Sequence, residues 1–231
     1  NRLAEILSKK FKGKQISNKQ KELLVKNSCI GRYENFVELL STIFELNEYP
    51  IAIDSARYGL VDWIQQIDKY GGDLLVEKNG QTIFDIAVEN TDSIYLKKAF
   101  EFIERIPIHI INRIVVRSIE INNDLTMKVI SEALDSNKNC NYFLNPSLIL
   151  IPSLSVNAFS IFKKNIDSKI HIDLSECVLN VSPKIILRLL DMYQFSKNEL
   201  KLACIKSLKS GNNDNSFIII EQNPFLLNEI N

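Results

Sequence analysis

The residue types that could carry catalysis in this chain occur in one short stretch. His171 and Asp173 are followed closely by Cys177. A cysteine, a histidine and a carboxylate can act as a nucleophile, its base and the group that orients the base. These groups work only when the fold brings them into a set geometry, which closeness in sequence does not provide. We therefore assign no catalytic residues and expect a chain that is not an enzyme.

The spacing of the remaining ligand-type residues indicates no metal or cofactor site. His109 lies in an apolar run, where packing is its expected role, and the seven glycines form no phosphate-binding loop. No Cys-x-x-Cys pair occurs among Cys29, Cys140, Cys177 and Cys204. Scattered single cysteines are typical of a reducing compartment, so we expect a cytoplasmic protein without metal or cofactor.

The charge of the chain is balanced overall, with 28 Lys+Arg and 28 Asp+Glu. A general nucleic-acid binder normally has a basic excess, so we expect no nucleic-acid partner. The N-terminal part is nevertheless basic through Lys9, Lys10, Lys12, Lys14, Lys19, Lys21 and Lys26. A solvated helix face or a flexible lead-in is the expected role of this segment, and peripheral contact with an anionic membrane or an acidic partner is the alternative. No apolar run is long enough for a transmembrane segment.

Amphipathic segments recur along the chain and would position any functional side chain. Apolar residues at three- and four-residue steps predict helices that begin near Glu34, Leu60, Ser93, Asp124, Ser155 and Pro183. The intervals are about 30 residues, the size of one helix-pair repeat. Shorter segments between them are candidate partner helices, at residues 51–58, 83–90, 108–119, 146–151 and 172–179.

Local signals mark several helix starts. Ser17 with Gln20, and Ser196 with Glu199, have the spacing of a capping box. Ser182 precedes a proline, which suits the first position of a helix. The best strand candidate, residues 216–220, could equally be a buried helical turn, and Trp63 is expected in the core. The predicted fold class is all-α.

One stretch is more specific than these patterns. Residues 79–87 read Asn-Gly-Gln-Thr-Ile-Phe-Asp-Ile-Ala, which resembles the opening of an ankyrin repeat, Asp/Asn-Gly-x-Thr-Pro-Leu-His-x-Ala. Ile83 and Asp85 replace the proline and the histidine of that pattern. A partial copy, Ile-Asp-Ser-Ala at residues 53–56, lies about 31 residues earlier. Thr82 can cap the first helix, Ala87 allows close helix packing, and Gly59 can end a helix in the left-handed conformation.

The resemblance is best over residues 50–103 and implies a helical-repeat solenoid of ankyrin-like pairs. No glycine occurs from Gln81 to Ser210, so we expect the later turns to be built differently. Degenerate ankyrin, HEAT-like and tetratricopeptide-like pairs all remain open there. The predicted domains are an N-terminal lead-in at residues 1–32, a repeat domain at 33–210 and a C-terminal cap at 211–231.

The resemblance implies a non-catalytic scaffold for protein–protein interaction. In that family, partners lie across the turn tips and the exposed side of the first helices, so Asp85 would also belong to the contact unless it bonds internally to Thr82. The chain begins without methionine, which indicates a fragment of a larger protein. The alternative is a targeting or substrate-selecting domain of a bacterial or viral effector enzyme, acting in the host cytosol. The implied partner-binding residues are Arg57, Tyr58, Glu77, Lys78, Asn79, Gln81, Glu89 and Asn90.

Overall fold

The computed structural model describes residues 9–11, 16–32, 36–103, 105–136, 156–165 and 172–228. Within these ranges the regular elements are helices, and the only β-type pairing is an isolated bridge between Lys78 and Gln81. The all-α prediction is therefore confirmed at the level of fold class. The described residues divide into two compact units, one up to Arg117 and the other from Ser118 onwards.

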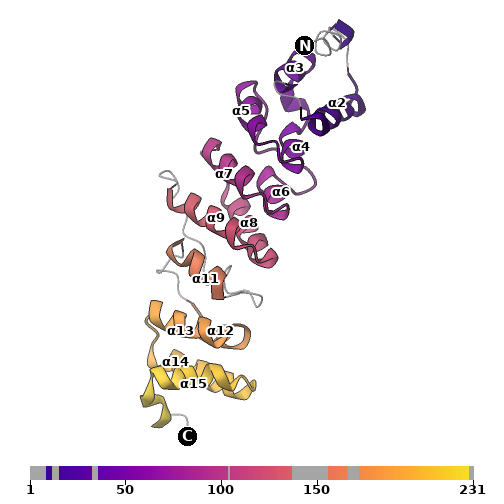
Figure 1. Ribbon diagram of the computed structural model, residues 1–231. Coiled ribbons are helices and arrows are strands. Elements are labelled where there is room, and N and C mark those ends of the chain that lie inside the picture. The colour runs from indigo at the N-terminus through magenta and orange to yellow at the C-terminus, as the bar shows by residue number, and fades with distance from the viewer. Residues whose placement is uncertain are drawn as a thin grey trace. The chain divides into compact units, whose positions relative to one another are not determined.

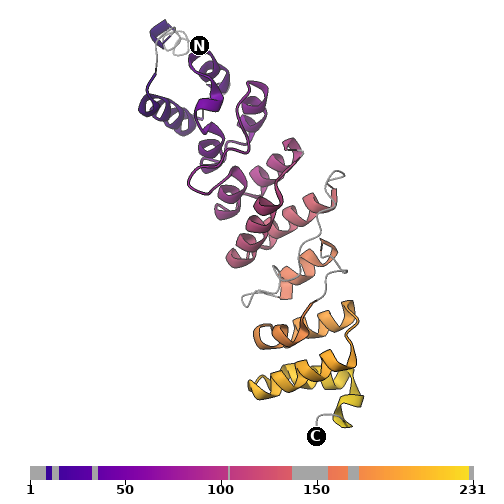
Figure 2. The same ribbon diagram turned by 180° about the vertical axis from the view of Figure 1, so that it is seen from behind.

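The first unit contains two rows of helices (Figure 1). One row holds α2 (Asn18–Gly31), α4 (Ile51–Arg57) and α6 (Ile83–Glu89), and the other holds α3 (Phe36–Ile43), α5 (Val61–Lys69) and α7 (Ser93–Phe102). Neighbouring helices pack on one another along each row. Between the rows, α4 packs on α5, and α6 packs on α7. The reverse view shows the same pairing (Figure 2). A short 3-10 helix, η1 (Leu46–Glu48), precedes α4.

The second unit is also helical. It contains α9 (Asp124–Ser136), α11 (Val156–Phe162), η2 (Lys163–Asn165), α12 (Leu174–Asn180), α13 (Pro183–Met192), α14 (Lys197–Lys209), α15 (Asn213–Gln222) and η3 (Pro224–Asn228). Here α12 packs on α14, α13 packs on α15, and α9 packs on α11. Helix α8 (Ile108–Ile121) belongs to the first unit as far as Arg117.

The helix starts agree closely with the sequence patterns. Each predicted amphipathic segment coincides with a helix, from α3 to α13, and so do the partner segments except residues 146–151, which lie outside the described residues. Both capping boxes form, at Ser17 and at Ser196. Ser182 stands at the N-cap of α13, but its hydroxyl makes no hydrogen bond. Residues 216–220 lie within α15, so the strand alternative is wrong.

Among the described residues, the same turn leads directly from one helix into the next at four places; Gly71 closes α5 in the same way, but a longer loop follows it. A residue one or two positions past the end of the first helix has a positive φ, and the next N–H donates to the carbonyl oxygen five residues back, which is the Schellman arrangement. The φ values are 63° at Gly59, 54° at Thr91, 55° at Asn122 and 79° at Gly211. The bonds are Leu60 to Ser55 at 2.9 Å, Asp92 to Ala87 at 2.9 Å, Asn123 to Ser118 at 3.4 Å and Asn212 to Ser207 at 3.0 Å. The expectation of different turns where glycine is missing is thus wrong at Thr91 and Asn122.

The turn between α12 and α13 is built differently, as expected. Val181 keeps a negative φ of −115°, so no left-handed residue closes α12. Instead, the Asn215 amide donates to the carbonyl oxygens of Val178 and Val181, at 2.8 and 3.0 Å. The Asn212 amide donates to the Val178 oxygen as well, at 3.0 Å. Two asparagine side chains therefore satisfy the carbonyl groups that a helix end leaves unpaired.

The core of the first unit confirms two predicted packing positions. Trp63 is buried in α5, and Ala87 is fully buried in α6. Tyr95 of α7 is also buried, and its hydroxyl lies 2.7 Å from the Ser55 hydroxyl of α4. The small side chain of Ala87 lets α6 pack closely on α4 and α7.

Candidate protein-binding surface

The loop before α6 ends in a tight hairpin turn. Lys78 and Gln81 exchange backbone N–H···O bonds of 3.0 and 3.1 Å. Asn79 and Gly80 between them have φ values of 54° and 75°. Positive φ at both central residues defines a type I′ turn, for which Asn-Gly is the preferred sequence. The turn therefore presents the Asn79 side chain to solvent on a well-defined backbone.

Asp85 anchors the residues that follow this turn. Its Oδ2 accepts hydrogen bonds from the N–H and the hydroxyl of Thr82, at 2.7 and 2.6 Å. Arg113 of α8 donates from Nε to Oδ1 at 2.6 Å and from Nη2 to Oδ2 at 2.7 Å. Asp85 is only 5% exposed. Its carboxylate is thus used inside the unit, where it ties the start of α6 to α8, and it is not placed to meet a partner.

The pKa of Asp85 reflects this environment. Burial alone would raise it, but the hydrogen bonds from Arg113 and Thr82 outweigh burial and hold the pKa below its ordinary value of 3.8. The hydrogen bond to Asp85 in turn raises the pKa of Arg113. Both groups are therefore charged at neutral pH, and their two parallel bonds form the strong bidentate type of ion pair.

Further polar contacts hold the turn against α6 and α8. Arg113 Nη1 donates to Glu77 Oε1 at 3.0 Å, and Gln81 Nε2 donates to Glu89 Oε2 at 2.8 Å. Arg117 Nη2 lies 3.7 Å from Glu89 Oε1. We refer to Glu77, Gln81, Asp85, Glu89, Arg113 and Arg117 as the tip network. The network thus holds the residues on both sides of the hairpin turn, Glu77 and Gln81, against α8 and α6.

Sequence reasoning missed the two arginines of this network. Their signal was nonetheless present, because Asp85 and Glu89 are four residues apart on α6, and Arg113 and Arg117 are four residues apart on α8. Residues with that spacing share one helix face. When two helices with such faces stack, as proposed for α6 and α8, the spacing predicts two ion pairs between them.

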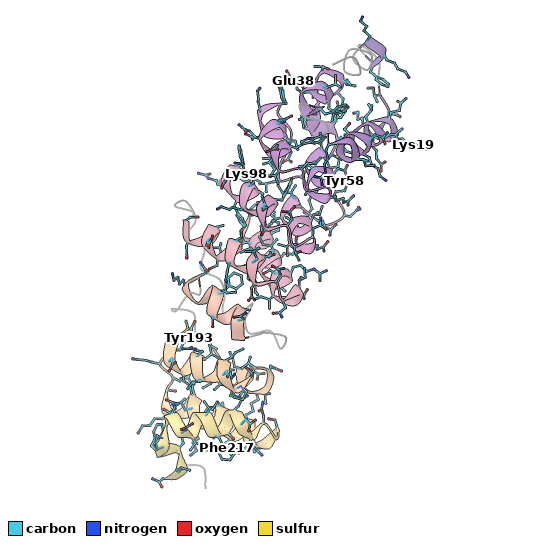
Figure 3. The ribbon with its side chains drawn as sticks, in the orientation of Figure 1. Lys19, Glu38, Tyr58, Lys98, Tyr193 and Phe217 are labelled. Atoms are coloured by element: carbon cyan, nitrogen blue, oxygen red, sulfur yellow. The ribbon has the colours of Figure 1, made fainter. Side chains whose placement is uncertain are left out.

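The structure places the predicted partner-binding residues at the end of α4, at the hairpin turn and at the end of α6. Arg57, Glu77, Asn79, Glu89 and Asn90 are exposed, whereas Tyr58, Lys78 and Gln81 are partly buried. Figure 3 labels Tyr58 beside α4.

These residues differ in their internal contacts. Arg57 Nη1 lies 3.6 Å from Asp54 Oδ1, and Lys78 Nζ lies 5.4 Å from the centroid of the Tyr49 ring. Glu77, Gln81 and Glu89 belong to the tip network. Within the described residues, no side-chain hydrogen bond or ion pair engages Tyr58, Asn79 or Asn90.

The stretch around Cys177 has a structural explanation. Burial, followed by the nearby Asp173 and Glu176 carboxylates, raises the pKa of Cys177 to about 11, whereas a nucleophilic cysteine has a lowered pKa. Asp173 Oδ1 accepts the Ser175 N–H at 2.9 Å and so caps α12. His171 lies outside the described residues. In the part that the structure describes, no three His, Cys, Asp or Glu side chains gather where they could hold a metal ion.

None of the helices that the structure describes has the length and apolar character needed to cross a membrane. Comparison of the chain with protein-family models, with curated proteins and with solved structures finds no match.

Proposed function

We propose that this chain is a non-catalytic scaffold for protein–protein interaction, built as a solenoid of ankyrin-like helix pairs. The observation that carries the proposal is the exposed type I′ turn at Asn79 and Gly80, which lies next to the part-buried Asp85–Arg113 ion pair and is tied to it through Glu77. A surface that is ordered before binding loses less conformational entropy when its partner arrives. The repeated Schellman turns and the stacking of first helices on first helices support the repeat architecture.

The partner surface consists of the exposed side chains around the tip network. Tyr58, Asn79 and Asn90 make no internal polar contact among the described residues, so their polar groups are available to another protein. Tyr58 supplies an aromatic ring, the residue type enriched at binding hot spots. Arg57 adds an exposed guanidinium next to it. Glu77, Gln81 and Glu89 serve chiefly to hold the turn.

Site-specific crosslinking tests this assignment. A photoreactive amino acid replaces Asn90 in one variant and Lys128, an exposed residue of α9, in a control. The Asn90 variant should crosslink one protein in cells that the control does not. With that protein purified, Tyr58→Ala should weaken the Kd by about tenfold or more, and Lys128→Ala should leave it unchanged. Equal crosslinking from both positions, with an unaffected Kd for Tyr58→Ala, would place the partner elsewhere.

A further inference from the structure

The N-terminal helix α2 has an unusual distribution of side chains. Its inward face consists of Lys21, Val25, Ser28 and Cys29, all buried. On its outward face Leu23 is 62% exposed and Ile30 is 61% exposed. Helices at a protein surface normally turn their large aliphatic side chains inward. Here two such side chains point away from the unit, whereas a lysine and a serine point in.

The Lys21 side chain makes its contacts inside the unit. Its ammonium group pairs with the Glu48 carboxylate and lies 5.4 Å from the centroid of the Phe44 ring. Its side chain is only 9% exposed. Lys21 therefore belongs to the packing of α2, and the remaining lysines of the helix carry its exposed charge.

The exposed lysines share a face with the exposed aliphatic residues. Lys19, Leu23, Lys26 and Ile30 follow one another at steps of four, three and four residues, which places them on one side of a helix. We call these four residues the outer stripe. Figure 3 labels Lys19 at the outer edge of α2. At 1.5 Å per residue the stripe is about 16 Å long, enough to lie flat on a surface.

The N-terminal sequence that contains this stripe has a strongly asymmetric charge. Residues 1–32 contain nine lysines and arginines but only two glutamates, although the whole chain has a net charge of zero. Lys9 and Lys10, in the described segment before α2, are also exposed. A local positive excess favours a negatively charged surface, and the rest of the chain carries the compensating acidic excess.

We propose that the outer stripe of α2 binds the surface of an anionic lipid bilayer. Lys19 and Lys26 contact the anionic headgroups, and Leu23 and Ile30 enter the boundary between headgroups and acyl chains. The flexible stems of the lysines allow their ammonium groups to stay at the headgroup level while the aliphatic groups insert. A partner recognised by charge alone, such as a nucleic acid, would leave Leu23 and Ile30 unused. This inference is independent of the protein-binding surface.

Vesicle co-sedimentation of the whole chain tests the proposal, with phosphatidylcholine vesicles that do or do not contain phosphatidylserine. The chain should bind only the anionic vesicles, and added salt should weaken this binding by screening the lysines. Lys19→Gln with Lys26→Gln should weaken binding about 25-fold, since each lysine contributes about fivefold. Leu23→Gln with Ile30→Gln should weaken it about tenfold.

Matched controls use equally exposed positions elsewhere. Lys128→Gln with Lys184→Gln, and Leu202→Gln, should leave vesicle binding unchanged, because these residues lie in the second unit. Absent binding, equal binding to neutral vesicles, or indifference to the Leu23 and Ile30 changes would overturn the proposal. Retention on DNA without vesicle binding would also overturn it and indicate a nucleic-acid partner. The salt dependence of the wild-type chain provides a test that requires no folded variant.

Discussion

Asp85 joins the start of α6 to α8 through one carboxylate. Asp85→Asn keeps the volume of the side chain but removes the charge that two Arg113 bonds require. We expect this change to lower the free energy of unfolding by about 2–4 kcal/mol, measured by urea denaturation at pH 7. Glu77→Gln removes a half-exposed partner of the same arginine and should cost less than about 1 kcal/mol. Equal losses from both variants would show that burial of the pair is unimportant.

The same ion pair predicts a pH dependence. Because the pKa of Asp85 lies below 3.8 in the folded chain, the unfolded chain takes up the proton first as the pH falls. The stability that this carboxylate contributes is therefore complete above its unfolded pKa and is lost as the pH drops through the folded value. The stability difference between wild type and Asp85→Asn should shrink between pH 5 and pH 3, about one unit either side of the unfolded pKa. A constant difference would exclude the charge as its source.

Thr91 offers a stabilising change. It has a φ of 54° and is β-branched, which makes the left-handed conformation costly. Thr91→Gly should raise the free energy of unfolding by about 0.5–1 kcal/mol, after allowance for the greater freedom of glycine in the unfolded chain. Gly59→Ala is the opposite case, because its φ is 63° and the added Cβ would lie 3.0 Å from Asp92 Oδ2. A loss of stability in both variants would contradict the shared turn geometry.

The parts of the candidate site that depend on neighbouring residues were predicted from the sequence, and those that depend on distant residues were not. Asn79-Gly80 predicted the tight turn, and Thr82, Gly59 and Ala87 were assigned correct local roles, because turn and helix-end preferences depend on neighbouring residues. Arg113 was missed, since its partners lie 28 and 36 residues away in the chain. Long-range pairs appear only when the stacking of helices is known.

Among the elements, helix positions were predicted well because amphipathic periodicity and capping are local properties. The turns between the helices were harder to predict. Thr91 has no preference for the left-handed conformation, so nothing local indicates that the turn after α6 repeats the one after α4. Likewise, the closure of α12 depends on Asn212 and Asn215, which lie more than thirty residues further along the chain.

Asn215→Ala tests that closure. The change removes the amide that donates to the Val178 and Val181 carbonyls and leaves part of the end of α12 unsatisfied. We expect the free energy of unfolding to fall by about 1–3 kcal/mol in urea denaturation. Asn213→Ala, an exposed position at the start of the same helix, should change it by less than about 0.5 kcal/mol. If the two variants have the same free energy of unfolding, water replaces the Asn215 amide at the end of α12.

At the scale of the whole molecule, two compact units predict uneven unfolding. In the repeat solenoid that we propose, each element is stabilised mainly by its neighbours, so a local defect need not spread. Asp85→Asn should speed hydrogen exchange in α4, α6 and the hairpin turn, while amides of α12 and α14 keep their protection. Mass-spectrometric hydrogen exchange measures both regions in one sample. A uniform increase across the chain would indicate a single cooperative unit.

The predicted domain limits at residues 32 and 210 remain predictions.

The four Schellman turns that lead directly from one helix into the next have a consequence for how such a chain can evolve. Their bonds join backbone groups only, so glycine, threonine and asparagine all build the same corner. A drift from glycine to another residue costs roughly 1 kcal/mol, a loss that compensating changes elsewhere can restore. In the repeat solenoid that we propose, the residues typical of a repeat can therefore be replaced one at a time while the backbone keeps its path. Ancestry in such chains is better sought in recurring backbone hydrogen bonds than in residue identity.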